Sequence, residues 1–304
     1  MYDLVIVGGG PGGVAAGVYA ARKKIKTLLI TDSFGGQSLV SADVRNWIGT
    51  KSIGGFDLGK MLEDHLRDQE DIDVIDNDLV TKVGKSDGGF KLRTQNGQTH
   101  ETRYLLLASG SRRKKLGVPG EKEFDGKGVA YCSTCDAPVF KNKVVAVVGG
   151  GNAGLEAVID LLSYASKIYL IVRSDSTRGD PVTQEKIKNS PKVEIIYKAL
   201  TREIIGNQFV AGLKYKDAKG EIKELKLDGV FVEIGSVPNS EIAKDLVQLN
   251  QLGEIIVDHK TQQTSNPGIW AVGDLSDVLY KQNNVSAGDA VKAVLNIYEK
   301  IHKG

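Results

Sequence analysis

The sequence has two cysteines, Cys132 and Cys135, and an acid, Asp136, follows them directly in the segment YCSTCDAPVF. Two cysteines separated by two residues can close a small disulfide loop or expose a thiolate of lowered pKa. When such a disulfide is reduced, one sulfur leaves as a thiolate that needs a proton, and Asp136 is adjacent to Cys135. The segment therefore predicts a two-electron redox centre with its own acid, although Asp136 could instead cap a helix.

A zinc site is the alternative chemistry for these cysteines. A structural zinc ion needs four ligands, commonly from two CxxC pairs or from cysteines and histidines at tight spacing. No histidine lies within thirty residues of the two cysteines, so a zinc site would have to be shared between two copies of the chain. We therefore expect no metal.

A glycine turn follows the first apolar segment, residues 2–7. In GGGPGG, the glycines Gly8, Gly10 and Gly13 satisfy G-x-G-x-x-G, and the small-residue segment GVAAGVYAARK predicts a helix directly after them. Such a helix can lie close to a sheet with its N-terminal amides aimed at a pyrophosphate. A second strand, KTLLIT, ends at Asp32, nineteen residues after Gly13, where a carboxylate can accept hydrogen bonds from a ribose.

The same pattern recurs 141 residues later. The strand VVAVV leads into GGGNAG, followed by a helix, LEAVIDLLSYA, and a strand, KIYLIV; the glycines of this second turn are Gly149, Gly151 and Gly154. A single glycine turn can occur without a ligand, but two complete strand–helix–strand units favour two dinucleotide sites.

The repeat also bears on which nucleotide the second site takes. Adding the offset of 141 to Asp32 gives Arg173, a cation that suits a 2′-phosphate rather than a bare ribose, and Arg178 lies five residues further on. Asp175 could serve an NADH ribose, or all three charges could belong to a solvated loop. We expect NADPH to be preferred, with appreciable NADH activity.

These elements predict an α/β fold of two Rossmann-like, three-layer nucleotide-binding domains, the second inserted into the first. Apolar strands at 104–110 and 229–239 close the two domains, and polar, proline-containing segments at 110–120 and 236–242 cross between them. We expect a discontinuous first domain of residues 1–113 and 242–304, and a second of residues 114–241 that carries the CxxC.

Composition excludes several classes of partner. Lys and Arg number 40 and Asp and Glu 38, a net charge of +2, so neither nucleic acid nor an anionic membrane is an expected partner. The N-terminus lacks a signal-peptide pattern, and no segment approaches the roughly 18 apolar residues of a membrane span. We expect a cytoplasmic protein, in which a lone CxxC is more often redox-active than structural.

The whole chain resembles the low-molecular-weight thioredoxin reductases, with a particular likeness to the flavoprotein subunit of alkyl hydroperoxide reductase. The resemblance rests on six motifs in family order and spacing: GGGPGG at 8–13, FGGQ at 34–37, RNWIG at 45–49, YCSTCD at 131–136, GGGNAG at 149–154 and GIWAVGD at 268–274. It implies FAD in the discontinuous domain, a nicotinamide nucleotide in the inserted domain and a homodimer.

The resemblance also implies roles for single residues. Cys135 would face the flavin, Cys132 would attack the disulfide of the partner protein, and Asp136 would donate a proton. The turn at 8–13 would hold the FAD pyrophosphate, and the residues beside the flavin and its ribityl chain would be Gln37, Asn46, Asp274 and Gln282. Without the family pattern, Gln37 could be a surface amide, Asn46 a turn residue and Asp274 a helix cap.

The chain departs from the family pattern in places that leave the catalytic groups intact. ASG at 108–110 stands for ATG, Ala137 for glycine and Lys281 for arginine. The NADPH-binding pattern HRRxxxR reads VRSDSTR at 172–178, so two of its three cations remain. This weakens the expected preference for NADPH.

The predicted function is that of an FAD-dependent NAD(P)H:disulfide oxidoreductase, a thioredoxin-disulfide reductase acting on thioredoxin or a thioredoxin- or glutaredoxin-like protein. The main alternative is the reductase component of a peroxide-scavenging system, here without the extra N-terminal redox domain of the fused flavoprotein subunit. An electron carrier to ferredoxin or quinone is disfavoured by the two cysteines. A nucleotide-sensing protein without turnover is disfavoured by the intact CxxCD and both glycine turns.

Overall fold

The structure, a computed structural model, describes residues 1–41 and 44–303, apart from the side chains of Val40 and Cys135. The chain divides into two compact units: an outer unit, Met1–Arg112 with Val237–Gly304, and an inserted unit, Arg113–Ser236. The boundaries expected from the sequence, after residues 113 and 241, lie one and five residues beyond these.

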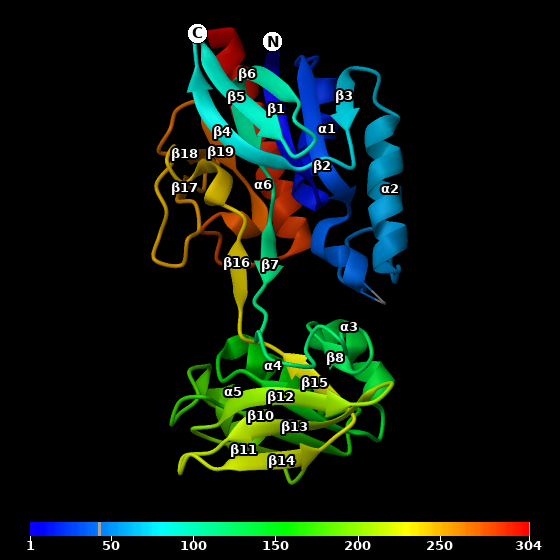
Figure 1. Ribbon diagram of the computed structural model, residues 1–304. Helices are drawn as coiled ribbons and strands as arrows, with labels where there is room; N and C mark the ends of the chain where they lie inside the picture. Colours follow the sequence, from blue (N-terminus) through cyan, green and yellow to red (C-terminus); the bar gives the residue numbers. More distant parts are fainter. Residues whose placement is uncertain (42–43, 304) are drawn as a thin grey trace. The chain divides into compact units, whose positions relative to one another are not determined.

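The outer unit is built on a nine-stranded sheet in which β1 (Tyr2–Gly9) pairs in parallel with β2 and β6 (Figure 1). Leu4 and Ile6 of β1 pack against the helices, and Val5 and Val7 pack against the opposite core. Both faces of the sheet are therefore buried, which explains the unbroken apolar run of this strand. The other strands of the sheet are β2 (Thr27–Phe34), β3 (Ile72–Ile75), β4 (Val80–Ser86), β5 (Gly89–Thr94), β6 (Thr99–Leu107), β17 (Val257–Asp258), β18 (Gln263–Thr264) and β19 (Ile269–Ala271).

Three α-helices of the outer unit contribute to the core on the side of Leu4. They are α1 (Pro11–Arg22), α2 (Gly55–Arg67) and α6 (Asn283–Lys303). Short 3-10 helices complete the unit: η1 (Gly36–Val40), η3 (Glu241–Ala243) and η4 (Gly273–Leu275).

The inserted unit repeats this plan on a smaller scale. Its five-stranded parallel sheet has the order β11-β10-β9-β15-β8, with bounds Val193–Ile196, Lys167–Ile171, Val144–Val148, Gly229–Val232 and Val129–Ala130. One face packs against η2 (Ala137–Phe140), α4 (Asn152–Leu161) and α5 (Pro181–Lys188), and the short helix α3 (Ser133–Asp136) directly precedes η2. The other face packs against an antiparallel sheet of β12 (Leu200–Gly206), β13 (Val210–Lys216) and β14 (Ile222–Lys226).

The chain crosses between the units twice, through β7 (Ser111–Arg113) and β16 (Ser236–Pro238), which pair with each other as a two-stranded ribbon. Within the inserted unit, Lys114 N also donates to Gly235 O at 2.9 Å. The two ends of the inserted segment are thus held side by side.

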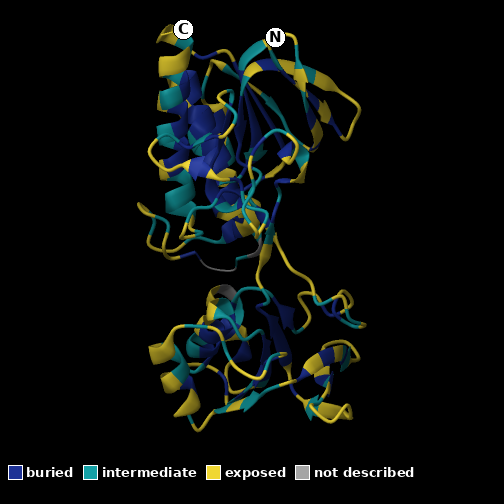
Figure 2. Ribbon diagram, turned by 90° about the vertical axis from the view of Figure 1, so that its left-hand side faces the viewer, coloured by how far each residue is buried: buried dark blue, intermediate teal, exposed yellow. Residues whose placement is uncertain are grey.

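The predicted fold class, two Rossmann-like α/β domains with the second inserted into the first, is confirmed. In each unit the buried residues line the parallel sheet and the helix faces that cover it (Figure 2). Within residues 1–41 and 44–303, no helix combines the length and the apolar character needed to cross a membrane.

Candidate active site

The first glycine turn joins β1 to α1 and has the shape that a dinucleotide requires. Gly8 has φ +114°, in the region that favours glycine, and a Cβ on Gly13 would lie 1.8 Å from the carbonyl oxygen of Gly8. A Cβ on Gly10 would meet only the Cα of Gly36, at 3.8 Å, so the turn is open there. The first glycine forms the turn, the third lets the helix approach, and the second leaves room for a pyrophosphate.

The second glycine turn, between β9 and α4, has the same three properties. Gly149 has φ +142°, and a Cβ on Gly154 would lie 2.0 Å from the carbonyl oxygen of Gly149. A Cβ on Gly151 would meet nothing within 4 Å in the described part of the chain. Each unit therefore has a backbone cradle that fits a pyrophosphate at a helix N-terminus.

Asp32 lies exposed within β2, near the first glycine turn. The sequence predicted that this strand ends at Asp32, but it continues to Phe34, because Phe34 pairs with Gly9 after an irregularity in the register. Gly35 N also donates to Gly9 O at 3.0 Å. The carboxylate therefore belongs to the strand end that flanks the turn, where a ribose would lie.

Two residues expected beside the flavin, Gln37 and Asp274, contact each other although 237 positions separate them. Gln37 Nε2 donates to Asp274 Oδ2 at 3.0 Å and to Ser111 Oγ at 2.9 Å, and Ser111 Oγ donates to Asp274 Oδ2 at 3.3 Å. Sequence reasoning missed Ser111. Its position directly after the small-residue turn ASG at 108–110 was the available signal.

The other two such residues, Asn46 and Gln282, form a second pair. Asn46 Nδ2 donates to Gln282 Oε1 at 3.1 Å, and Asn284 Nδ2 donates to the carbonyl of Asn46 at 2.6 Å. Asn283 Nδ2 donates to Ser38 Oγ at 2.9 Å, so the start of α6 also contacts the segment next to Gln37. Asn284 is a second residue that the sequence did not single out.

Lys281, which replaces the family's arginine, is anchored beside Asp274. Its Nζ lies 2.8 Å from Glu254 Oε1 and donates to the carbonyls of Ser276 at 2.6 Å and Asp274 at 3.3 Å. The cation thus holds backbone carbonyls within η4 and at its C-terminal end.

The cysteine segment forms the short helix α3, with Cys132 at its N-cap. Cys132 is disulfide-bonded, and the part of the chain that the structure describes contains no free cysteine. The backbone of Cys135 lies in α3, but its side chain is outside the described residues. Cys132 is therefore in its oxidised form.

Asp136 ends α3, and its backbone N donates to the carbonyl of Cys132 at 3.0 Å. Its side chain makes no capping hydrogen bond to η2, which follows, so the helix-cap interpretation is not supported. Burial raises the pKa of the Asp136 carboxyl above its ordinary value. A carboxyl that holds its proton more tightly is better suited to donate one near neutral pH.

Two further acids, Asp160 of α4 and Glu233 after β15, contact the first residues of α3. Ser133 Oγ and Thr134 Oγ1 donate to Asp160 Oδ2 at 2.7 and 3.3 Å. The backbone N–H of Ser133 faces the carboxyl of Glu233 and lowers its pKa. The sequence singled out neither acid; a carboxylate at the end of the apolar run GVFVEIG was the signal for Glu233.

The two cations predicted for a 2′-phosphate lie on the loop after β10. Arg173 is exposed just after the strand, and Arg178 N donates to Gly150 O at 2.7 Å, which brings the loop back to the second glycine turn. Over the described residues, neither guanidinium takes part in an ion pair. Asp175 on the same loop is exposed and accepts from Ser176 Oγ at 3.2 Å.

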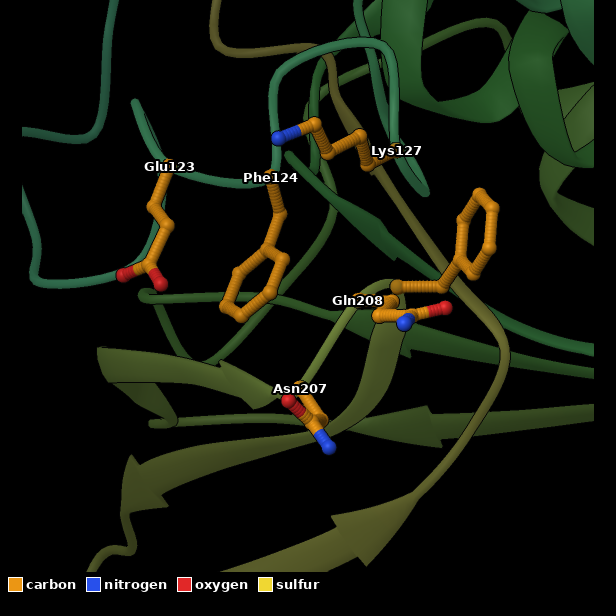
Figure 3. A pocket seen from close by; sticks show the side chains of 6 residues that line it. Glu123, Phe124, Lys127, Asn207 and Gln208 are labelled. Atoms are coloured by element: carbon orange, nitrogen blue, oxygen red, sulfur yellow. The ribbon is translucent and has the colours of Figure 1, made fainter.

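A surface hollow of the inserted unit is formed by other residues (Figure 3). Its lining consists of Glu123, Phe124, Lys127, Asn207, Gln208 and Phe209. None of them belongs to the cysteine segment or to either glycine turn, and we assign this hollow no role in the chemistry.

Comparison with known proteins assigns the chain to a family. Residues 2–293 match the model of the pyridine nucleotide-disulphide oxidoreductases. The chain is 42% identical over 304 residues to a subunit of the alkyl hydroperoxide reductase of Pseudomonas putida, and 41% identical over 299 residues to a protein of Bacillus subtilis named NADH dehydrogenase. These alignments cover 99% and 98% of this chain but 58% of each relative, so the chain spans about three-fifths of their length.

Among solved structures, the thioredoxin reductase of T. acidophilum is similar along the whole chain. It is 36% identical with a TM-score of 0.76, and the alignment covers 99% of both chains. Together with the sequence relatives, this structure confirms the resemblance that the six motifs indicated.

Proposed function

Because the chain belongs to the pyridine nucleotide-disulphide oxidoreductase family, we propose that it is an FAD-dependent NAD(P)H:disulfide oxidoreductase. Its substrate is thioredoxin or a thioredoxin- or glutaredoxin-like protein, which it reduces through Cys132 and Cys135. The observation that carries the proposal is the disulfide of Cys132 at the start of a helical turn that ends in Asp136, an acid of raised pKa. An electron carrier without a dithiol step would need neither group.

In this proposal the two nucleotides are divided between the two domains. Residues 1–113 and 242–304 hold FAD, with its pyrophosphate on the turn at 8–13 and its ribose at Asp32. The side chains that orient the flavin are Gln37, Asn46, Asp274 and Gln282. Two hydrogen-bonded pairs already join these four side chains, which supports a common role.

Residues 114–241 hold the nicotinamide nucleotide on the turn at 149–154. NADPH is preferred, because the exposed cations Arg173 and Arg178 suit its 2′-phosphate. NADH remains a substrate, since Asp175 lies on the same loop and one relative is named NADH dehydrogenase.

The bound nucleotides supply the electron pair that reduces the disulfide. The sulfur–sulfur bond of Cys132 breaks, and Asp136 gives its proton to one of the two sulfurs. Cys135 is the sulfur on the flavin side, and Cys132 is the thiolate that attacks the disulfide of the partner protein. Cys135 then displaces the partner, whose two cysteines leave reduced while the disulfide of this chain is restored.

A second candidate function is the reductase component of a peroxide-scavenging system. The 42% identity to a subunit of an alkyl hydroperoxide reductase favours it. The chemistry at Cys132 would be the same, but the acceptor would be a dithiol carrier that serves a peroxidase. For either function we propose a cytoplasmic protein, because the cytosol keeps such dithiols reduced. The proposed homodimer rests on the family resemblance alone.

Anaerobic titration of the purified protein tests the proposal. NADPH, and separately NADH, should bleach the flavin absorbance, and denaturation should release FAD rather than FMN. Oxidised thioredoxin, glutaredoxin or a peroxidase carrier, added one at a time, should then restore the absorbance. A chain that holds no flavin, or whose reduced flavin no protein disulfide reoxidises, would contradict the proposal.

A further inference from the structure

Glu233 of the inserted unit lies where three neighbouring strands end, and it has no role in the reaction proposed for Cys132, Cys135 and Asp136. It follows β15, which pairs in parallel with β9 on one side and with β8 on the other (Figure 1). The strand β9 leads to the glycine turn, and β8 leads to Cys132. Because carboxyl ends of parallel strands share one edge of a sheet, Glu233 is placed between the nucleotide cradle and the disulfide.

The side chain of Glu233 is buried, with 5% of it exposed. The backbone N–H of Ser133, the residue that follows Cys132, faces this carboxyl and lowers its pKa, although burial has the larger, opposite effect. Because Phe231 of β15 pairs with Ala130 of β8, Glu233 and Cys132 each lie two residues beyond this pair, which places the carboxyl within roughly 8 Å of the Cys132 sulfur.

Charged groups from the neighbouring elements face Glu233. Arg113 Nη1, on β7, lies 3.5 Å from Glu233 Oε2, whereas Asp160 and Glu156 of α4 add negative charge. Asp136 is the titratable group of α3 itself. Burial outweighs the cation and raises the pKa of Glu233 to about 7.

We propose that Glu233 is a proton-linked positioning residue of the disulfide centre, which faces the first amide of α3 and takes up a proton when the Cys132 disulfide is reduced. This inference rests on the proposed redox role of that disulfide. It goes beyond that role because it assigns the second proton of the reaction to a group outside the CxxCD segment.

Two electrons, from reduced flavin or from an added dithiol, break the sulfur–sulfur bond; one proton binds to one sulfur, and the Cys132 sulfur remains a thiolate. A second proton binds to the ionised carboxylate of Glu233, so the site as a whole gains no charge. A thiolate within roughly 8 Å raises the proton affinity of a buried carboxylate on the order of tenfold or more, which drives this uptake.

The test is the midpoint potential of the dithiol as a function of pH in the flavin-loaded protein. The protein is equilibrated with dihydrolipoamide/lipoamide buffers from about pH 6 to pH 9, and reduced thiols are alkylated and quantified by mass spectrometry. Each extra proton changes the equilibrium constant tenfold per pH unit, about 30 mV for a two-electron couple. Between pH 7 and roughly pH 8, where only the reduced form binds this proton, the wild-type potential should therefore fall about 30 mV per pH unit more steeply than that of Glu233→Gln, and below pH 7 the two slopes should agree.

Glu156→Gln is the matched control, because it removes an exposed carboxylate that also faces Glu233. Its potential should keep the wild-type slope. Parallel lines for wild type and Glu233→Gln across the whole range would overturn the inference, as would loss of the slope in Glu156→Gln.

If Glu233→Gln does not fold, infrared difference spectra decide the question in the Asp136→Asn variant, where the other carboxyl of the segment cannot contribute. Reduction at about pH 8 should add a protonated-carboxyl band, and its absence would overturn the inference. Neither measurement uses a nicotinamide nucleotide or a protein substrate. If the protein shows the extra slope but reduces no protein disulfide, the role of Glu233 is supported and the proposed function is contradicted.

Discussion

The buried carboxyl of Glu233 should make the stability of the inserted unit depend on pH. The ordinary pKa of a glutamate side chain is 4.5, and burial raises that of Glu233 to about 7. Below pH 4.5 the folded and unfolded chains are both protonated at this group. Between pH 4.5 and 7 the unfolded chain releases the proton while the folded chain keeps it, so stability is lost as pH rises through this window.

The difference between the two pKa values corresponds to about 3 kcal/mol of unfolding free energy, at 1.36 kcal/mol for each pH unit. Glu233→Gln keeps the size of the side chain and an acceptor oxygen, but it does not titrate. Relative to wild type, the free energy of unfolding of the variant should therefore rise by about 3 kcal/mol between pH 4.5 and pH 8.

Amide hydrogen exchange of peptides that contain β9 and β15 measures this quantity for the inserted unit alone, after correction for the intrinsic exchange rate at each pH. Glu156→Gln is again the control and should show a much smaller change, because its carboxylate is exposed. A free-energy difference between Glu233→Gln and wild type that stays constant with pH would refute the reasoning.

Three further outcomes test the proposed chemistry. Cys132→Ser and Cys135→Ser should each abolish reduction of a protein disulfide but leave flavin reduction by NADPH intact, which stopped-flow absorbance would show; near wild-type turnover in either variant would count against the relay. Asp136→Asn should slow turnover roughly 10²-fold, the scale of a positioned general acid, and an unchanged rate would remove its role as proton donor. Arg173→Ala should lower kcat/KM for NADPH roughly tenfold or more and leave that for NADH nearly unchanged, since only NADPH has the 2′-phosphate; equal losses for both nucleotides would show that the cation serves another purpose.

The parts of the fold that could be predicted from sequence are those that depend on residues close together in the chain. Gly8 and Gly149 are recognisable because a turn with positive φ, a strand before it and a small-residue helix after it occupy one continuous segment. The CxxCD segment is similarly local. The end of β2 was less predictable, because its last residues are set by pairing between Phe34 and Gly9.

The residues that could not be predicted owe their roles to strand order. Nothing near position 233 indicates that β15 lies between β9 and β8, yet this order is what brings Glu233 to Ser133. The pairing of Asn46 with Gln282 spans 236 positions and was implied only by the family resemblance. Ser111 and Asn284 contact these residues through the same long-range packing.

The ribbon of β7 and β16 has a consequence for how the chain folds. The inserted unit is continuous in sequence, Arg113–Ser236, whereas the outer unit must join two segments that the insertion separates. Closing a flexible loop of about 120 residues costs about 4 kcal/mol in chain entropy. When the inserted unit folds first, its paired ends replace that long loop with a short one, so much of this cost is met before the outer sheet forms. During synthesis the inserted unit can fold while residues 237–304 are still being added, and β19 then joins β6 to complete the outer sheet.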